Sequence, residues 1–288
     1  MEEYQISELF NDSQRLANAL NIHYDMSASV LTNQSKALEL FDKIQKRQIE
    51  MVWIGDKNYP NRLRNFAKND MPPVLFCQGN LNLLKNMSVG FCGSRKSSEK
   101  GLSITKQCVI QLIEKEIDIV SGYAAGVDIT SHQSALEFGG NTIIVLAEGL
   151  FKSSQKREIK PFLSHDNYLF ISQFLPDMTW NSHNAMRRNS TILGLSDAMI
   201  LVESGITGGT FQAGQTALKT DKPLFVIDFS NTEQSSEANP YFIERGAIPI
   251  RKSKTSSTPN LSKLFDTLEL KSQEIQENQN LLEFVTTQ

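Results

Sequence analysis

The chain has 288 residues, which at roughly 150 residues per domain predicts about two structural units. A hydrophobic fraction of 40% and a charged fraction of 21% are typical of globular proteins and exclude wholesale disorder. The net charge of −3 shows that the chain as a whole is not a polycation. Any binding to nucleic acid must therefore come from a local basic patch.

The composition also excludes some classes of protein. No apolar run approaches the roughly 18 residues of a membrane-spanning helix, and the acidic start Met1-Glu2-Glu3 does not resemble a secretory signal. Cys77, Cys92 and Cys108 are odd in number and have no CxxC spacing, which argues against a disulfide framework and a thiolate zinc site. We therefore expect a cytoplasmic protein with buried, reduced cysteines and no cofactor.

The N-terminal part of the chain is predicted to be a small helical region, residues 1–57. Apolar residues recur there at helical spacing in two runs, and Ser35 is the predicted N-cap of the second run. Residues 51–54 predict a short strand. Prolines at 60 and 72–73 then break the pattern, and residues 74–77 predict another strand.

From residue 88 onward, strands and helices alternate. The predicted strands are residues 88–92, 117–120, 142–147, 168–171, 198–202 and 224–227, and the predicted helices are 101–116, 127–138, 184–194 and 209–219. The strands are nearly continuous apolar runs, so both of their faces should be buried by helices. The predicted fold class is α/β, a Rossmann-like, doubly wound and mostly parallel sheet at residues 58–270, followed by a polar tail at 271–288.

Three of these strands end in loops rich in glycine and hydroxyl residues. The loops are Gly93-Ser94-Arg95, Ser121-Gly122-Tyr123-Ala124-Ala125-Gly126 and Thr207-Gly208-Gly209-Thr210. Ligands of open α/β sheets bind beyond the carboxyl ends of the strands, where glycine lets the backbone approach closely and free N–H groups at helix starts attract phosphate. Arg95 can add a bidentate contact. Three such loops on one sheet predict an anionic ligand.

Other polar clusters leave alternatives open. We interpret Arg187-Arg188-Asn189 as a phosphate-binding patch, with solvated helix charges as the alternative, whereas the basic run at 152–160 is better explained as a solvated loop. Asp128 and His132 lie at i and i+4. They are either an acid–base pair or, as we favour, a helix-start aspartate and a histidine with another partner.

Two nucleotide-binding motifs are absent, and three aromatic residues are available. The sequence has no GxGxxG and no GxxxxGK[ST], which argues against dinucleotide binding of the usual kind and against a P-loop ATPase. Trp53, Trp180 and Tyr123 could stack on bases, although a tryptophan is more often a core residue.

Taken in order, these motifs resemble the DNA-processing protein A family, also called DprA or Smf. The family pattern reads approximately GSR…G, then SGxAxGID..AH..AL..GG.TI.VL..GL, then RN.II.GLSD..LVVE, a glycine-rich turn and N..LI..GA. The similar segments here are residues 93–101, 121–150, 188–203, 208–210 and 239–247. The resemblance covers about residues 58–250.

The resemblance implies a Rossmann-like core that binds single-stranded DNA through its phosphates and is not an enzyme. It also implies a homodimer that hands single strands to a RecA-type recombinase in recombination and DNA uptake. The implied phosphate pocket, with Arg187 added from the basic cluster, consists of Gly93, Ser94, Arg95, Ser121, Gly122, Gly126, Arg187, Arg188, Asn189, Gly208, Gly209 and Thr210.

The sequence also departs from the family pattern. Ala125 stands where the family has arginine, Ala185-Met186 replaces Phe-Pro, and Ser190 replaces a second arginine. Glu148 stands in the family's GCGL segment, where its carboxylate would repel phosphate unless it points away or pairs with a basic residue. Residues 1–50 lack the helix–hairpin–helix glycine signature, and the tail is too short for the winged helix of many members. The sequence therefore resembles a divergent, trimmed member.

Two other functions use the same pocket. The chain could be a nucleotide sensor or an antitoxin-like partner in an antiphage or toxin–antitoxin module, binding a cognate protein through its N-terminal helices. It could also be an enzyme on nucleotides, similar to the cytokinin-activating phosphoribohydrolases. Their glycine-rich turn is followed by a glutamate, but residues 211–213 here are Phe, Gln and Ala, so the carboxylate needed for catalysis is absent.

Overall fold

The computed structural model describes residues 12–66, 71–231, 234–253 and 258–286. The chain divides into two compact units, Met1–Glu50 and Met51–Gln288, whereas the sequence predicts a first boundary at 57/58. The first unit contains α2 (Ser13–Leu20), α3 (Tyr24–Thr32) and α4 (Gln34–Lys46).

The prediction that Ser35 caps a helix is wrong. Helix α4 begins at Gln34, so Ser35 lies inside its first turn, and the residue at the cap position is Asn33. The Asn33 side chain does not cap α4, because its amide donates to the backbone oxygen of Ser29 (2.8 Å) at the end of α3. The two helices thus follow each other with a single residue between them, which leaves no room for a separate cap.

The second unit is built on a nine-stranded sheet in the order β1-β2-β6-β5-β4-β3-β7-β8-β9. The strands are β1 (Glu50–Trp53), β2 (Val74–Gly79), β3 (Ser88–Cys92), β4 (Asp118–Ser121), β5 (Thr142–Val145), β6 (Tyr168–Ser172), β7 (Ala198–Leu201), β8 (Leu224–Ile227) and β9 (Ile248–Ile250). Strands β3 to β9 pair in parallel, and β2 pairs antiparallel with β6. This confirms the predicted α/β fold with a mostly parallel sheet.

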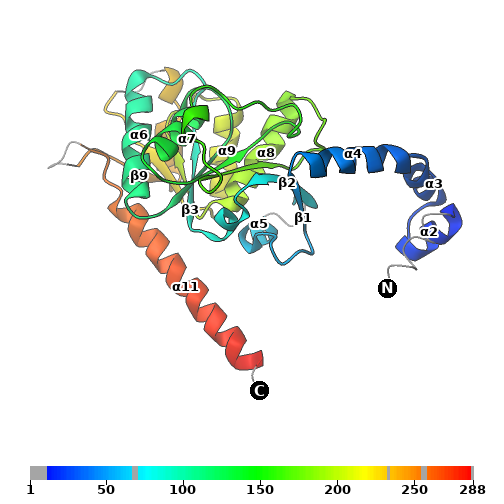
Figure 1. Ribbon diagram of the computed structural model, residues 1–288. Helices are drawn as coiled ribbons and strands as arrows, with labels where there is room; N and C mark the ends of the chain where they lie inside the picture. Colours follow the sequence, from blue (N-terminus) through cyan, green and yellow to red (C-terminus); the bar gives the residue numbers. More distant parts are fainter. Residues whose placement is uncertain (1–11, 67–70, 232–233, 254–257, 287–288) are drawn as a thin grey trace. The chain divides into compact units, whose positions relative to one another are not determined.

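Helices cover both faces of the sheet (Figure 1). One apolar cluster contains side chains of α5 (Asn61–Phe66), α8 (Ser182–Leu195), α9 (Gly209–Lys219) and α10 (Asn239–Glu244), and the other contains side chains of α6 (Glu99–Ile113), α7 (Val127–Glu137) and α11 (Ser262–Thr286). Successive residues of β7 alternate between the clusters, because Met199 packs in the first and Ile200 in the second. Burial on both faces explains why the strand is apolar throughout.

Strand β3 marks the point where the winding of the sheet reverses. Strands β4, β5 and β6 extend the sheet from one side of β3, and β7, β8 and β9 extend it from the other. The chain runs from β3 into α6 on one face and from β7 into α9 on the opposite face. The loops after these neighbouring strands therefore diverge, as they do at the ligand-binding crevices of doubly wound folds.

The C-terminal part of the chain contains two elements that the sequence did not predict. Strand β9 includes Pro249, which is tolerated because β9 is an edge strand. Helix α11 runs without a break past residue 271, where the sequence predicts the start of a polar tail. Figure 1 shows α11 beginning beside the sheet and continuing beyond it.

One buried carboxylate joins three elements at the amino edge of the sheet. Asp197 lies just before β7 and accepts hydrogen bonds from Arg62 Nη1 of α5 (2.9 Å) and from the Ser88 N–H of β3 (3.0 Å). Its other oxygen lies 3.1 Å from Lys271 Nζ of α11. Because a single carboxylate compensates two cations, we expect its removal to be costly.

We predict that Asp197→Ala lowers the free energy of unfolding by about 3 kcal/mol, because Arg62 is left buried without its counter-charge. Urea denaturation measures the loss. The matched control is Asp228→Ala, which breaks an ion pair with Arg251, whose side chain is 69% exposed, and should cost under about 1 kcal/mol. Equal losses in the two variants would contradict the anchoring role of Asp197.

Candidate functional site

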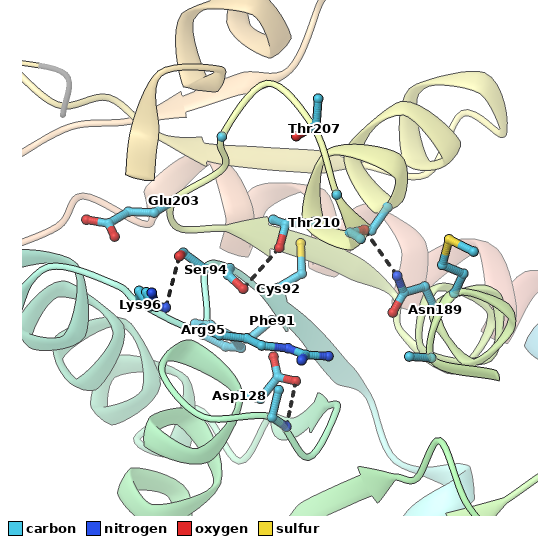
Figure 2. A pocket seen from close by; sticks show the side chains of 18 of the residues that line it. Phe91, Cys92, Ser94, Arg95, Lys96, Asp128, Asn189, Glu203, Thr207 and Thr210 are labelled. Atoms are coloured by element: carbon cyan, nitrogen blue, oxygen red, sulfur yellow. Dashed lines mark hydrogen bonds between the residues drawn. The ribbon is translucent and has the colours of Figure 1, made fainter. Parts of the chain in front are cut away.

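A cavity of about 770 Å³ lies at the carboxyl edge of the sheet, where the loops after β3 and β7 diverge (Figure 2). Its walls come mainly from residues 91–96, from the loop within 203–210 and from α8 between residues 182 and 192. Predicted site residues that line it are Gly93, Ser94, Arg95, Arg188, Asn189, Gly208, Gly209 and Thr210. The structure therefore brings eight of the twelve predicted residues to one cavity.

Side-chain hydrogen bonds to glycine carbonyls tie the walls together. Thr210 Oγ1 donates to the Gly93 oxygen (3.0 Å), and Asn189 Nδ2 donates to the Gly209 oxygen (3.1 Å); Figure 2 shows both bonds. Gly208 has a φ of +94°, which favours glycine, and α9 begins at the next residue. The N–H groups of the first turn of α9 have no acceptor within the helix, so this wall attracts anions.

Glu203 brings a carboxylate to the cavity, but its oxygens are occupied. The side chain is only 1% exposed and accepts hydrogen bonds from the N–H (2.9 Å) and the hydroxyl of Ser98, the N-cap of α6. A Cβ at Gly101 would lie 2.6 Å from a Glu203 oxygen, so that glycine makes room for the contact. Glu203 thus fixes the start of α6, and Figure 2 shows it across the cavity from Asn189.

Arg188 is a buried wall of the cavity. Its exposed fraction is 7%, and its Nη1 donates to the Val145 oxygen (3.3 Å) and lies 3.8 Å from Asp128 Oδ2. Burial lowers the pKa of Arg188 and raises the pKa of Asp128, and in each case the charge of the other residue opposes the shift. Arg188 Nε has no hydrogen-bond partner among the described residues.

Three of the remaining predicted residues support the walls. A Cβ at Gly122 would lie 1.5 Å from Arg188 Nη1, so this glycine leaves space for a side chain of the protein. Ser121 Oγ donates to Asp128 Oδ1 (3.1 Å). Gly126 has a φ of +79°, and a Cβ there would lie 2.3 Å from the Ser94 oxygen. None of the three is among the residues that line the cavity.

Arg187 and Trp180 differ from the predictions in opposite ways. The Arg187 guanidinium carbon lies 6.0 Å from the centre of the Phe174 ring, and Arg187 does not line the cavity. Trp180 is 50% exposed and lines the cavity, with the Arg95 guanidinium carbon 5.7 Å from its ring centre. From the sequence we named Trp180 as a residue that could stack on bases, but the sequence alone does not distinguish an exposed tryptophan from a core residue.

His132 and Asp128 have separate partners. His132 is buried, with Nδ1 2.6 Å from Thr142 Oγ1 and Nε2 2.6 Å from the Gly122 oxygen. Burial lowers its pKa to about 4. Asp128 faces Arg188 instead, so the interpretation that we favoured from the sequence is confirmed.

A second cavity of about 320 Å³ adjoins the first and shares Arg95, Ala124, Trp180 and Arg188 with it. Lys156 lines this second cavity. Its Nζ donates to the backbone oxygen of Tyr123 (2.6 Å) and lies 4.5 Å from the centre of the Tyr123 ring. The interpretation of the run at 152–160 as a solvated loop is therefore wrong for Lys156. Sequence reasoning missed this residue because only the folded chain brings it against Tyr123.

Burial makes the thiols of Cys92 and Cys108 weakly acidic. Cys77 and Cys108 are buried, and Cys92 lines the first cavity. Burial raises the pKa of Cys92 and of Cys108 to about 12. Within the described ranges, no group of three or more His, Cys, Asp or Glu side chains could hold a metal ion, and no helix combines the length and apolar character needed to cross a bilayer.

The chain is similar to proteins that process DNA. The profile of a family described as DNA recombination-mediator protein A matches residues 50–258. DNA processing protein DprA of Streptococcus pneumoniae is 33% identical over 180 residues, which cover 62% of this chain and 63% of that protein. Protein Smf of Escherichia coli is 28% identical over 261 residues, which cover 84% of this chain and 69% of that protein.

Two solved structures have a similar fold. The X-ray structure of DprA from Streptococcus pneumoniae has a TM-score of 0.69 at 26% identity, covering 87% of this chain and 95% of that one. DNA processing protein A from Helicobacter pylori, solved to describe its single-stranded DNA binding mode, has a TM-score of 0.64 at 25% identity, covering 78% of this chain and 97% of that one.

We predict that Gly122→Ala lowers the free energy of unfolding by about 1–3 kcal/mol, because the new methyl group overlaps the buried Arg188 guanidinium. Urea denaturation tests this. The control is Gly209→Ala, where the nearest atom to the new Cβ is 3.6 Å away and alanine suits the helix start better than glycine. A Gly122→Ala protein as stable as the control would show that Arg188 can leave its position freely.

The low pKa of His132 predicts a loss of stability in acid. The unfolded imidazole binds a proton below about pH 6.5, whereas the folded one resists protonation until about pH 4, so stability falls as the pH drops through this window, by up to about 3 kcal/mol. Chemical denaturation at several pH values should show a smaller acid loss for His132→Gln. The exposed control His165→Gln should keep the wild-type pH dependence.

Proposed function

The chain belongs to the DNA recombination-mediator protein A family, and on this premise we propose that it binds single-stranded DNA through the phosphate backbone without altering it chemically. The observation that carries the proposal is the cavity between β3 and β7. It combines the glycine turns, the first turn of α9 and the charges of Arg95 and Arg188 on one surface. Such groups bind phosphate irrespective of base sequence.

The charge balance of the cavity supports an anionic ligand. Its two carboxylates, Asp128 and Glu203, are occupied by Arg188 and Ser98. Arg95 and Lys96 also line the cavity. The Helicobacter pylori relative, whose single-stranded DNA binding mode has been described, supports the choice of ligand.

The same contacts support binding without catalysis. The Cys92 thiol, with a pKa raised to about 12, stays protonated at neutral pH and is a poor nucleophile. Asp128 and Glu203 accept hydrogen bonds from backbone or hydroxyl groups of the fold, so their oxygens hold the walls in place. Neither carboxylate is therefore poised as a general base.

The proposal extends to the protein's partners. We infer from the family that the chain acts as a homodimer and passes the bound strand to a RecA-type recombinase in recombination or DNA uptake. This chain spans 63% of the pneumococcal relative in the region of similarity, so partner binding requires its own test with the purified protein.

We predict that the protein binds a labelled oligo(dT) in fluorescence anisotropy, and that the affinity falls as salt rises because binding releases cations from the strand. Arg95→Ala should weaken binding several-fold and reduce the slope of log K against log salt by about 1. The control is Lys115→Ala, which removes an exposed cation between α6 and β4, at the opposite edge of the sheet, and should bind like the wild type.

Two results would contradict this proposal. One is the absence of binding at low salt, and the other is an equal effect of the Arg95 and Lys115 substitutions. Strong thermal stabilisation by one free nucleotide, without binding of oligo(dT), would favour the nucleotide-sensing alternative.

A further inference from the structure

The second cavity adjoins the first, in which we proposed that phosphate binds. The two cavities share four residues, Arg95, Ala124, Trp180 and Arg188, so these residues form the boundary between them. The smaller cavity is otherwise lined by Tyr123, Ala125, residues 146–148, Ser154 and Lys156. The second cavity therefore adds polar side chains that do not line the first cavity.

Glu148 is the unusual group of this cavity. Its backbone oxygen accepts a hydrogen bond from Ser172 Oγ (2.7 Å), which anchors the loop that follows β5. Burial raises the pKa of its carboxyl group, and the charge of Lys156 opposes that shift. Across the described residues, the carboxylate has no hydrogen-bond donor and no cation within 4.0 Å. It would repel phosphate, but its oxygens can accept hydrogen bonds from a ligand.

Lys156 supplies the complementary donor. One proton of its ammonium group is used in the hydrogen bond to the backbone oxygen of Tyr123, which leaves two protons for a ligand. Arg95 adds a second cation at the boundary between the cavities. The cavity thus offers acceptors from one side chain and donors from two others, a pattern suited to a polar heterocycle.

Guanine matches this pattern best among the DNA bases. Its Watson–Crick edge carries two adjacent donors, N1–H and the N2 amino group, which one carboxylate can accept together, and its O6 and N7 accept from cations. Adenine, cytosine and thymine each present one donor group on that edge. We propose that the second cavity is a base subsite in which Glu148 selects guanine, an inference that rests on the proposed binding of single-stranded DNA.

Trp180 provides the apolar contact that a splayed base requires. Its ring is half exposed and lines both cavities. Proteins that bind unpaired strands commonly stack bases on such rings and read the base edges with polar groups. Stacking favours any base, so the choice among bases falls to Glu148.

The test compares oligo(dT) with strands of equal length that carry one central dG, dA or dC, by competition in fluorescence anisotropy. We expect the dG strand to bind the wild type at least about fivefold more tightly than oligo(dT), the lower end of discrimination by a bidentate contact. Glu148→Gln should lose this preference and bind oligo(dT) at least as tightly as the wild type, because the repulsion of phosphate is removed.

Two further variants separate charge from geometry. Glu148→Asp keeps the charge but shortens the side chain, so it should lose the dG preference without gaining affinity for oligo(dT). Glu137→Gln removes the same charge from α7, where Glu137 pairs with Lys106 (3.3 Å), and should keep the preference. Unchanged melting temperatures would show that the Glu148 variants are folded.

The outcomes distinguish the subsite from the proposed function. Salt-dependent binding of oligo(dT) that needs Arg95 but shows no dG preference would overturn the subsite and leave the proposed function standing. A dG preference retained by Glu148→Gln would also overturn the role of Glu148. The absence of binding to every strand would reject the proposed function and the subsite together.

Discussion

The buried Arg188–Asp128 pair fixes the geometry on which the candidate site depends. Burying a guanidinium is costly unless a carboxylate and hydrogen-bond acceptors compensate it. Asp128 provides the carboxylate from the first turn of α7, and the carbonyl of Val145 provides an acceptor at the end of β5. Gly122 leaves the necessary space after β4. One side chain of α8 thereby connects the ends of two neighbouring strands, β4 and β5.

This arrangement explains the different roles of similar glycine loops. Gly93, Gly208 and Gly209 line the cavity, whereas Gly122 accommodates Arg188 and Gly126 lies against the Ser94 backbone. A sequence indicates that a strand-end glycine permits a close approach, but not whether a ligand or the protein itself makes that approach. The fold class, the positions of every strand except β9 and eight of the cavity residues could therefore be predicted, but the division between lining and support could not.

Other differences arise from contacts between distant segments. Lys156 looked like one cation of an exposed run, and only its position against Tyr123 brings it into the second cavity. Strand β9 was missed because three residues including a proline carry little periodic signal. Helix α11 was divided into core and tail because its sequence becomes polar beyond the part that packs on the sheet. Local sequence patterns identify helices and strands well. They fail where contacts between distant segments determine the structure.

The hydrogen bond between Thr210 and Gly93 joins residues that are 117 positions apart in the sequence. The walls of the cavity come from the segment around Gly93 and from the segment around Thr210. Each glycine turn can form early and locally, but the cavity exists only after β7 has inserted beside β3. A chain still emerging from the ribosome would therefore carry the turns without the cavity. Any partial unfolding that separates β7 from β3 should therefore remove the cavity, even where each glycine turn keeps its local structure.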